Sequence, residues 1–591
     1  GNDLNLEDNS TQILFYETKS KTSCESFNGV SQIFGNENFV QGYSEIDYKK
    51  SGSRFVSNLR VAKQPIKAPY LISNADVITC DSVAFLENDN VMDRIKMDGK
   101  LLVQTTLPSN RFWASLSLET QNEILLKNVQ LFTVNGNVIL EKYAVEDKMV
   151  SGLHACILAL QEEFFIQQDL EILLKSISEV DTSILEAASA APIEMDAEFI
   201  DSLLGKLMTG RGAELPVSAI PADGTYPTDT SKFNSRNNGN ALPEWDADAC
   251  TQCGACSMAC PQGAIRIKAY DDSYLENAPA AFQSVKAIDD DFQIDLLNYT
   301  VQVNPDQCTS CNNCVDACPA KALVMKEKSI LRETDSGLRR NENWKHFESI
   351  PEFDRTRLDT TKVSQQQLQE PLFKYSIGVD GCGEAPYLKL ISQLFGDRML
   401  VANATGASSI FGGALPSTPW AKNEQGRGPA WSNSLFEDNA EFGLGYRLSL
   451  DQKEQQAKTL LKNLLPELDF DLAHDIMTAV QQSEKQINEQ RERVELLKAH
   501  LTTVVNEDAN RLLPIADSLV KQSVWIVGGD GWAYDIGYGG LDHVIASGKN
   551  VNILVLDNEV YSNTGGQMSK STPFGASAKF AANGKQKKKK D

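Results

Sequence analysis

Short apolar runs typical of β-strands recur through the first third of the 591-residue chain. They lie within 67–86, 100–107 and 130–140, and polar or glycine-containing segments separate them. At 153–180 the apolar spacing changes to that of an amphipathic helix, which contains His154 and Cys156. No residue near these two has metal-ligand spacing, so we expect both in the core. The pattern predicts one mixed α/β domain over 24–205, with a linker at 1–23 before it.

The middle of the chain alternates between weakly and strongly patterned segments. Proline, glycine, asparagine and serine are frequent in 206–245, which predicts a linker or an extended arm wrapped around a neighbour. A charged stretch at 331–369 predicts a second linker. The segment 451–510 is strongly helical, and we expect it to pack on its own domain rather than to form an interaction helix pair.

Near the end of the chain, 523–567 has the pattern strand, glycine turn, helix, strand. This order is one unit of a parallel α/β sheet. Because a doubly wound sheet needs further strands to bury both faces, we expect the domain at 370–591 to be incomplete in this chain. The fold class is thus a multidomain α/β protein.

Composition excludes two classes of partner. Hydrophobic residues make up 41% of the chain, and no apolar run reaches the ~18 residues of a membrane span. A net charge of −24 argues against a nucleic-acid partner, and the basic run GKQKKKKD at 584–591 predicts a solvated tail or loop. The first residues are polar and acidic without an initiating methionine, so we expect no signal peptide, and a processed chain or a fragment.

The spacing of the cysteines gives the first indication of a metal site. Eight of the twelve fall into two groups, and Cys24, Cys80, Cys156 and Cys382 are dispersed. Grouped cysteines without a secretory signal are typical of metal ligands in a reducing compartment, so we expect the cytoplasm or the matrix of an organelle.

The motif C-x2-C-x2-C-x3-C-P occurs twice, between 246 and 330. In bacterial ferredoxins the fourth cysteine of each such run binds the other cluster. We therefore expect two [4Fe–4S] clusters, and zinc is the main alternative because Cys pairs also bind it. The expected ligands are Cys250, Cys253, Cys256 and Cys318 for the first cluster, and Cys308, Cys311, Cys314 and Cys260 for the second.

A second candidate site follows the strand at 523–529. Asp530 stands between Gly529 and Gly531, and Asn558 comes 28 residues later at the end of the next expected strand. Side-chain oxygens of Asp530 and Asn558, with the carbonyl of Val560, form a ligand set for Mg²⁺, which would bridge a diphosphate.

The pattern GDG followed by an asparagine resembles the thiamine-diphosphate motif, and Asn563 in NTGGQ is a further candidate for cofactor binding and catalysis. A plain α/β turn is the alternative. A dinucleotide site is disfavoured because no G-x-G-x-x-G opens this helix.

Taken together, these motifs resemble the pyruvate:ferredoxin (flavodoxin) oxidoreductase family. The likeness extends over nearly the whole chain, through the two cysteine motifs and through segments at 40–52, 66–77, 381–406, 428–443 and 528–585. The resemblance implies oxidative decarboxylation of a 2-oxo acid, foremost pyruvate, to an acyl-coenzyme A. Single electrons pass through [4Fe–4S] clusters to ferredoxin or flavodoxin.

The resemblance also assigns the domains. It implies a γ-like, coenzyme A-associated domain at 24–205, a two-cluster ferredoxin domain at 246–330 and the thiamine-diphosphate domain at 370–591. The family's N-terminal domains, which carry the catalytic acid and much of the substrate pocket, are not in this sequence. The resemblance therefore implies that other domains or a partner chain complete the active site, in an expected homodimer.

A third cluster of the family is in doubt here. The family places its ligands in CxGCGE and ATGCSS, but this chain reads VDGCGE and ATGASS. Val379 and Ala407 stand where two thiolates are expected, and their side chains cannot bind iron. Cys382 is then expected to be a buried small residue. The alternative function is a non-catalytic iron–sulfur electron-transfer module, or a paralogue that has lost the proximal cluster.

Overall fold

The computed structural model describes residues 10–17, 38–46, 55–83, 85–86, 91–105, 107–116, 118–134, 177–180, 182, 202–208, 212–233, 241–293, 296–327, 336–413 and 416–590. Within them the chain divides into two compact units, 1–225 and 226–591. No helix among these residues is long and apolar enough to cross a membrane. Cys24, His154 and Cys156 lie outside the described residues.

The first unit is built on a seven-stranded mixed sheet in the order β2-β3-β1-β4-β5-β6-β7. The strands β1, β4, β5 and β6 are parallel, and β2, β3 and β7 join antiparallel. Two short helices, α3 and α4, follow β5. The bounds are β1 Thr11–Glu17, β2 Phe39–Ile46, β3 Phe55–Ala62, β4 Ala75–Cys80, β5 Ile95–Gln104, α3 Ser109–Ser115, α4 Leu118–Leu126, β6 Gln130–Val134 and β7 Ile177–Glu179.

Two predictions for this unit are wrong. The segment 1–23 is not only a linker, because β1 pairs with β3 and β4 and carries fully buried Ile13, Leu14 and Phe15. A short continuous apolar run is typical of a central strand, although its polar flanks suggested a linker. The end of the predicted amphipathic helix is strand β7, because it completes the sheet beside β6.

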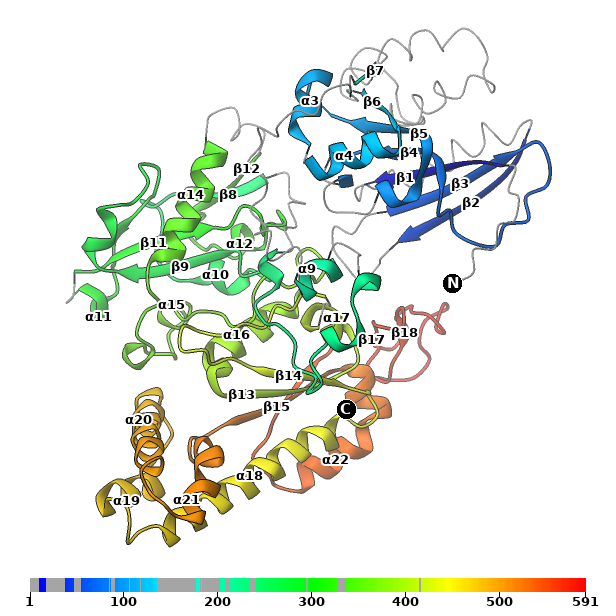
Figure 1. Cartoon of the computed structure of the whole chain (residues 1–591). Helices are drawn as coiled ribbons and strands as arrows, with labels where there is room; N and C mark the ends of the chain where they lie inside the picture. The colour runs from blue at the N-terminus through cyan, green and yellow to red at the C-terminus, as the bar shows by residue number, and fades with distance from the viewer. Residues whose placement is uncertain are drawn as a thin grey trace. The chain divides into compact units, whose positions relative to one another are not determined.

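In the second unit, a cysteine-rich module holds two small antiparallel sheets (Figure 1). One pairs β8 with β12, and the other has the order β10-β11-β9. Short helices α10 and α12 lie at matching positions in the two halves. The bounds are β8 Ala241–Trp245, α10 Ala255–Ala259, β9 Ile265–Tyr270, β10 Val285–Lys286, β11 Asn298–Val303, α12 Asn313–Asp316, β12 Leu323–Glu327 and α14 Ser336–Ser349.

Both predicted linkers of this region contain packed structure. Strand β8 lies within 206–245 and pairs with β12, so the cysteine-rich module begins before 246. Helix α14 lies within 331–369, and its Trp344 and Phe347 pack with Tyr270 and Phe282. The sequence pattern did not indicate α14, because charged residues outnumber the few apolar residues on its buried face. The prediction of an extended arm agrees with 229–231, whose backbone bonds to the segment 418–420.

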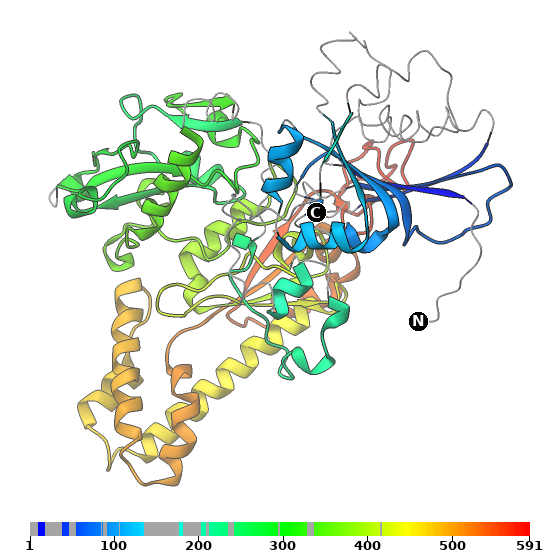
Figure 2. The same cartoon turned by 45° about the horizontal axis from the view of Figure 1, so that its top comes forward.

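The last domain has a four-stranded parallel sheet in the order β14-β13-β15-β16. Helix α18 lies along β13 and β15 and continues into a helical segment with α19, α20 and α21 (Figures 1 and 2). The bounds are α16 Ala385–Phe395, β13 Met399–Ala404, α17 Ala407–Gly412, β14 Ala430–Ser434, α18 Asn439–Asn463, α19 Phe470–Thr478, α20 Glu484–Leu501, α21 Glu507–Leu512, β15 Ser523–Gly529, the π-helix η10 Gly531–Ile536, α22 Tyr538–Ala546, β16 Asn552–Leu556, β17 Val560–Tyr561 and β18 Gln567–Met568.

The helical segment predicted at 451–510 is present and has its own apolar core, made mainly by leucines of α18, α20 and α21. An ion-pair network of Glu484, Arg398, Arg355, Asp397 and Arg491 joins α20 to the part of the domain around α16. Buried arginine–carboxylate networks fix geometry because each charge is costly to leave unpaired. The segment therefore packs on its own domain.

The basic end of the chain is not a free tail. Lys585 is buried and donates hydrogen bonds to the carbonyls of Ser569, Lys570 and Thr572. Lys589 forms ion pairs with Asp557 and Glu559. These contacts fold 584–590 back onto the loop after β18, so the run forms an exposed loop, one of the two predicted alternatives, and not a free tail.

Candidate functional site

The two cysteine motifs form matched loops. Gln252 and Ser310 each stand two residues after the first cysteine of a motif, and both have positive φ, at 54° and 57°. Gly254 and Asn312 match in the same way, at 74° and 71°. Left-handed backbone is uncommon for residues other than glycine, so its recurrence at equal offsets indicates a repeated loop held by its surroundings.

The thiols of the two motifs interleave. Burial raises the pKa of Cys256 to about 12, and the nearby thiols that add to this rise are those of Cys250, Cys253 and Cys318. Burial also raises the pKa of Cys314, and the thiols of Cys260, Cys308, Cys256 and Cys311 add to this rise. A fourth cysteine of each motif thus lies among the first three of the other. Crowded thiols are costly to ionise until a metal binds them.

The second group encloses a cavity. Cys260, Cys308, Cys311 and Cys314 line it, together with apolar side chains of β9, β11 and β12. A sulfur-lined cavity with apolar walls favours a buried redox group over an exposed one. Among the described residues, no group of three or more His, Cys, Asp or Glu side chains is arranged to hold a single metal ion.

A pocket opens at the carboxyl ends of the parallel strands of the last domain, where ligands bind in open α/β sheets. It is lined by Gly529, Gly531, Asn558, Val560 and Asn563, which are five of the six residues predicted to bind the cofactor. Asp530, the sixth, lies fully buried next to it. The lining comes from five separate segments, at 384, 405–408, 436, 529–532 and 556–564, which the fold brings to one place.

Asp530 has one carboxylate oxygen satisfied and one not. Oδ2 accepts a hydrogen bond from the Ser569 hydroxyl, whereas Oδ1 is buried without a hydrogen-bond partner. Burial raises the pKa of Asp530, and Asp557 adds to the rise. A buried, unpartnered carboxylate oxygen is costly by itself and is well suited to a cation. This feature fits the predicted magnesium site.

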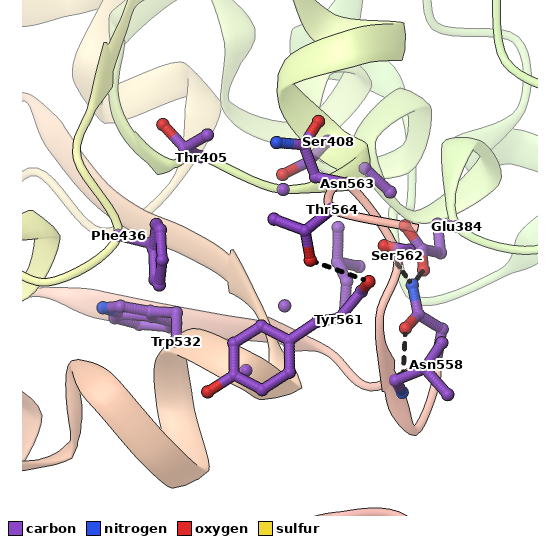
Figure 3. Close-up of a pocket in the computed structure, with 16 residues that line it drawn as sticks. Glu384, Thr405, Ser408, Phe436, Trp532, Asn558, Tyr561, Ser562, Asn563 and Thr564 are labelled. Carbon is purple, nitrogen blue, oxygen red and sulfur yellow. Dashed lines mark hydrogen bonds between the residues drawn. The ribbon is translucent and has the colours of Figure 1, made fainter. Parts of the chain in front are cut away.

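Asn558 is held by a residue that the sequence reasoning missed. Its Nδ2 donates to Oε1 of Glu384 over 2.8 Å, and its Oδ1 accepts from the backbone N–H of Val560 over 3.4 Å (Figure 3). Burial raises the pKa of Glu384, and Asp530 contributes to the rise. Glu384 ends the GCGE turn directly before α16. Its distance of 174 residues from Asn558 gave no local signal.

Aromatic side chains form the other side of the pocket. Figure 3 shows Phe436 and Trp532 opposite Glu384 and Asn558, with Tyr561 between them. Thr405 and Ser408, from the segment after β13, complete the wall. None of these residues was predicted. An apolar wall facing a polar one is typical of a cofactor pocket, because it excludes water and leaves a few groups to orient the ligand.

The residues at the positions where the family binds its third cluster do not all lie in one place. Cys382 is buried in the apolar core beside α16, as predicted. Ala407 lines the pocket, whereas Val379 is 60% exposed. Neither side chain has a ligand atom for iron. The described residues therefore do not fit a third cluster of the family type.

Three family profiles match the chain. A "4Fe-4S dicluster domain" covers 249–322, and a "Thiamine pyrophosphate enzyme, C-terminal TPP binding domain" covers 513–591. A "Domain of unknown function" named EKR covers 187–238, which spans the end of the predicted domain at 24–205 and most of the predicted linker at 206–245. The geometry and these matches define a chain with iron–sulfur clusters and a thiamine-diphosphate site.

Comparison with curated relatives indicates which enzymes of this class the chain resembles. The chain is 45% identical to a "Putative pyruvate-flavodoxin oxidoreductase" of Synechocystis sp., over 99% of this chain and 52% of the relative. It is 44% identical to the "Pyruvate-flavodoxin oxidoreductase" of Trichormus variabilis, over 100% of this chain and 53% of that one. Identity to the "Pyruvate:ferredoxin oxidoreductase" of Moorella thermoacetica is 37%, over 94% and 50%.

The chain is homologous over nearly its whole length to the pyruvate-flavodoxin oxidoreductase family and spans about half the length of these relatives. The sequence-based assignment to this family is confirmed.

Proposed function

We propose that this chain is the cofactor-bearing part of a pyruvate:ferredoxin or pyruvate:flavodoxin oxidoreductase. The reaction is the oxidative decarboxylation of pyruvate to acetyl-coenzyme A, with electrons leaving through two [4Fe–4S] clusters. The observation that carries the proposal is the pocket around Asp530 and Asn558, on the same chain as the interleaved cysteine motifs. The names of the relatives supply the substrate class.

The cluster ligands are proposed in the crossed arrangement. Cys250, Cys253, Cys256 and Cys318 hold the first cluster, and Cys308, Cys311, Cys314 and Cys260 the second. The thiols around Cys256 support the first set, and the cavity that Cys260 lines together with Cys308, Cys311 and Cys314 supports the second. When bound in these sets, the [4Fe–4S] clusters would supply one-electron transfer.

Mg²⁺ and thiamine diphosphate are proposed at the pocket. Asp530, Asn558 and the carbonyl of Val560 would hold the metal, and the backbone at Gly529 and Gly531 would approach the diphosphate. Thiamine diphosphate supplies the carbanion chemistry that allows a 2-oxo acid to lose carbon dioxide. Trp532 and Phe436 exclude water from the pocket. Asn563 lines the pocket, and its amide would donate a hydrogen bond to a bound group.

The remaining parts of the activity lie with other domains. We propose that coenzyme A is the acyl acceptor, that the first unit contributes to its site, and that the domains missing from this half-length chain complete the substrate pocket. Ferredoxin or flavodoxin takes the electrons, and two copies of the chain associate with those domains.

The proposal is tested with the missing domains supplied as a separate chain. Pyruvate, coenzyme A, Mg²⁺ and thiamine diphosphate are added, and reduction of methyl viologen is recorded. The proposal expects reduction that requires both pyruvate and thiamine diphosphate. A control with Asn558→Ala is expected to lose it, because the mutation removes a proposed metal ligand.

The second candidate is an electron-transfer module without decarboxylase activity. Ala407 and Val379 favour it, because they leave a gap where the family has a third cluster. Binding of thiamine diphosphate without viologen reduction in the complemented assay would select this candidate. Iron analysis separates the cases further, because two clusters give about eight irons per chain and three give about twelve.

A further inference from the structure

Lys389 is a fully buried lysine at the junction of the cysteine-rich module and the thiamine domain. It lies on α16 with 1% of its surface exposed. Its Nζ donates hydrogen bonds to the carbonyl of Met258 over 3.3 Å, to that of Cys260 over 2.9 Å and to that of Ser257. All three acceptors belong to the other module. Lys389 thus reaches from the thiamine domain into the first cysteine loop.

The three carbonyls stand at a special point of that loop. Helix α10 ends at Ala259. The carbonyls of Ser257 and Cys260 each accept one backbone N–H, from Cys260 and Gly263, and Lys389 adds a second donor to each. The same turn connects Cys256 with Cys260, which are assigned to different clusters in the proposed function. A cation here therefore lies close to a ligand of each cluster.

The partners of Lys389 indicate a charged amine. Three carbonyl acceptors match the three N–H donors of an ammonium group, whereas a neutral amine has only two. No carboxylate forms an ion pair with Lys389 among the described residues; the nearby groups that become negative when a metal binds them are the thiols of Cys260 and Cys256. A buried cation without a carboxylate is costly unless another negative charge compensates it.

An iron–sulfur cluster supplies such a charge. Reduction adds one electron and makes the cluster more negative by one unit. A fixed cation in a medium of low dielectric constant stabilises the reduced form more than the oxidised form. We infer that Lys389 raises the reduction potentials of both clusters, as a positioning residue that acts through its charge. This inference rests on the proposed function, since it presupposes the two clusters.

The position of α16 gives the charge a role in the proposed reaction. The helix begins at Ala385, directly after Glu384, which lines the pocket. Lys389 follows about one turn later and holds the cluster loop. One helix therefore borders the site where electrons are released and carries the cation that favours their arrival at the clusters.

A purely structural role is the alternative, in which Lys389 only ties the two modules together. Three variants of the full 591-residue chain separate the roles: Lys389→Arg keeps charge and donors, Lys389→Gln keeps a donor without charge, and Lys389→Met removes both. A matched control is Lys268→Gln. Lys268 is also buried and also donates to two carbonyls, of Phe347 and Ile350, but it pairs with Glu352, and no cysteine is among the groups that shift its pKa.

The experiment is a dithionite titration followed by EPR, with iron counted in each sample. We expect Lys389→Gln and Lys389→Met to shift both potentials to more negative values, and Lys389→Arg and the Lys268 control to titrate like the wild type. If Lys389→Met does not fold, the Gln and Arg pair carries the comparison.

Unchanged potentials in iron-replete Lys389→Gln would overturn the inference and leave the proposed function standing. Loss of iron with unchanged potentials in the clusters that remain would establish the structural role instead. A wild-type chain that holds no cluster after reconstitution would overturn the proposed function and this inference together.

Discussion

The hydroxyl of Ser569 donates a hydrogen bond to Oδ2 of Asp530, although 39 residues separate the two in the chain. This contact orients the carboxylate so that Oδ1 stays buried without a hydrogen-bond partner. A carboxylate held in this way is poised for a cation, at a cost to the stability of the empty site. Binding and stability are therefore expected to oppose each other at Asp530.

Asp530→Asn tests this opposition. Loss of the charge is expected to weaken binding of Mg²⁺ and thiamine diphosphate at least about tenfold, because a hard cation prefers a carboxylate. The folded state raises the pKa of Asp530. As pH falls, the wild type should therefore lose affinity for Mg²⁺ at a higher pH than a site with an ordinary aspartate would. Calorimetric titration from pH 5 to 8 measures both effects. Asp542→Asn, on the exposed face of α22, is the control.

Two glycines of this region make a matched pair. A Cβ at Gly531 would lie 2.5 Å from the ring of Tyr561, which lines the pocket, whereas a Cβ at Gly539 meets nothing within 4 Å. We expect Gly531→Ala to displace Tyr561 and to weaken binding of thiamine diphosphate. Gly539→Ala is expected to leave binding unchanged and to stabilise α22 by up to about 1 kcal/mol. Equal affinities in the two variants would contradict the pocket assignment.

The crossed cluster ligands predict which double variants lose one cluster and which lose two. Cys253→Ser with Cys318→Ser removes two ligands of the same cluster, so about four irons should remain of about eight. Cys253→Ser with Cys260→Ser removes one ligand from each cluster and should leave few. Iron analysis after anaerobic reconstitution gives the answer. The reverse order of iron contents would show that each motif holds its own cluster.

Lys585 supports Asp530 indirectly, because it binds the carbonyls of the loop that carries Ser569. Lys585→Met leaves three carbonyls with fewer partners and is expected to lower the free energy of unfolding by about 1–3 kcal/mol. Weaker binding of thiamine diphosphate should accompany it. Lys588→Met is the control, since Lys588 is exposed in the same segment. Thermal unfolding of both variants with and without the cofactor measures the difference.

Glu17 predicts a pH dependence in the first unit. Burial raises its pKa from 4.5 to about 7, and Asp81 adds to the rise. The folded state then binds a proton more tightly than the unfolded state, so stability is greatest below pH 4.5 for this group and falls as pH rises toward about 7. Glu17→Gln should remove this loss and stabilise the chain at pH 8 by about 2 kcal/mol. Urea unfolding at pH 5 and pH 8 compares the two proteins, and an equal pH dependence would refute the prediction.

The sequence by itself determined the chemistry of this protein. The repeated cysteine spacing indicated two clusters, and the GDG turn with Asn558 indicated the diphosphate site, because both signals are local and depend on fixed offsets along the chain. The parallel unit at β15 and β16 and the helical segment were predicted for the same reason. Local periodicity predicts a helix or strand when that element satisfies its own hydrogen bonds or buries one face.

Only the tertiary structure determined which distant segments of the chain contact one another. The sequence pattern predicts a linker at β1, because the burial of this strand depends on β3 and β4. It also predicts a linker at α14, because the few apolar residues of this helix pack against distant segments. Glu384 reached Asn558, and Lys389 reached the carbonyls around Cys260, across more than a hundred residues. Such contacts leave no pattern in a single sequence, because their energy comes from burying charges and polar groups that only the folded chain brings together.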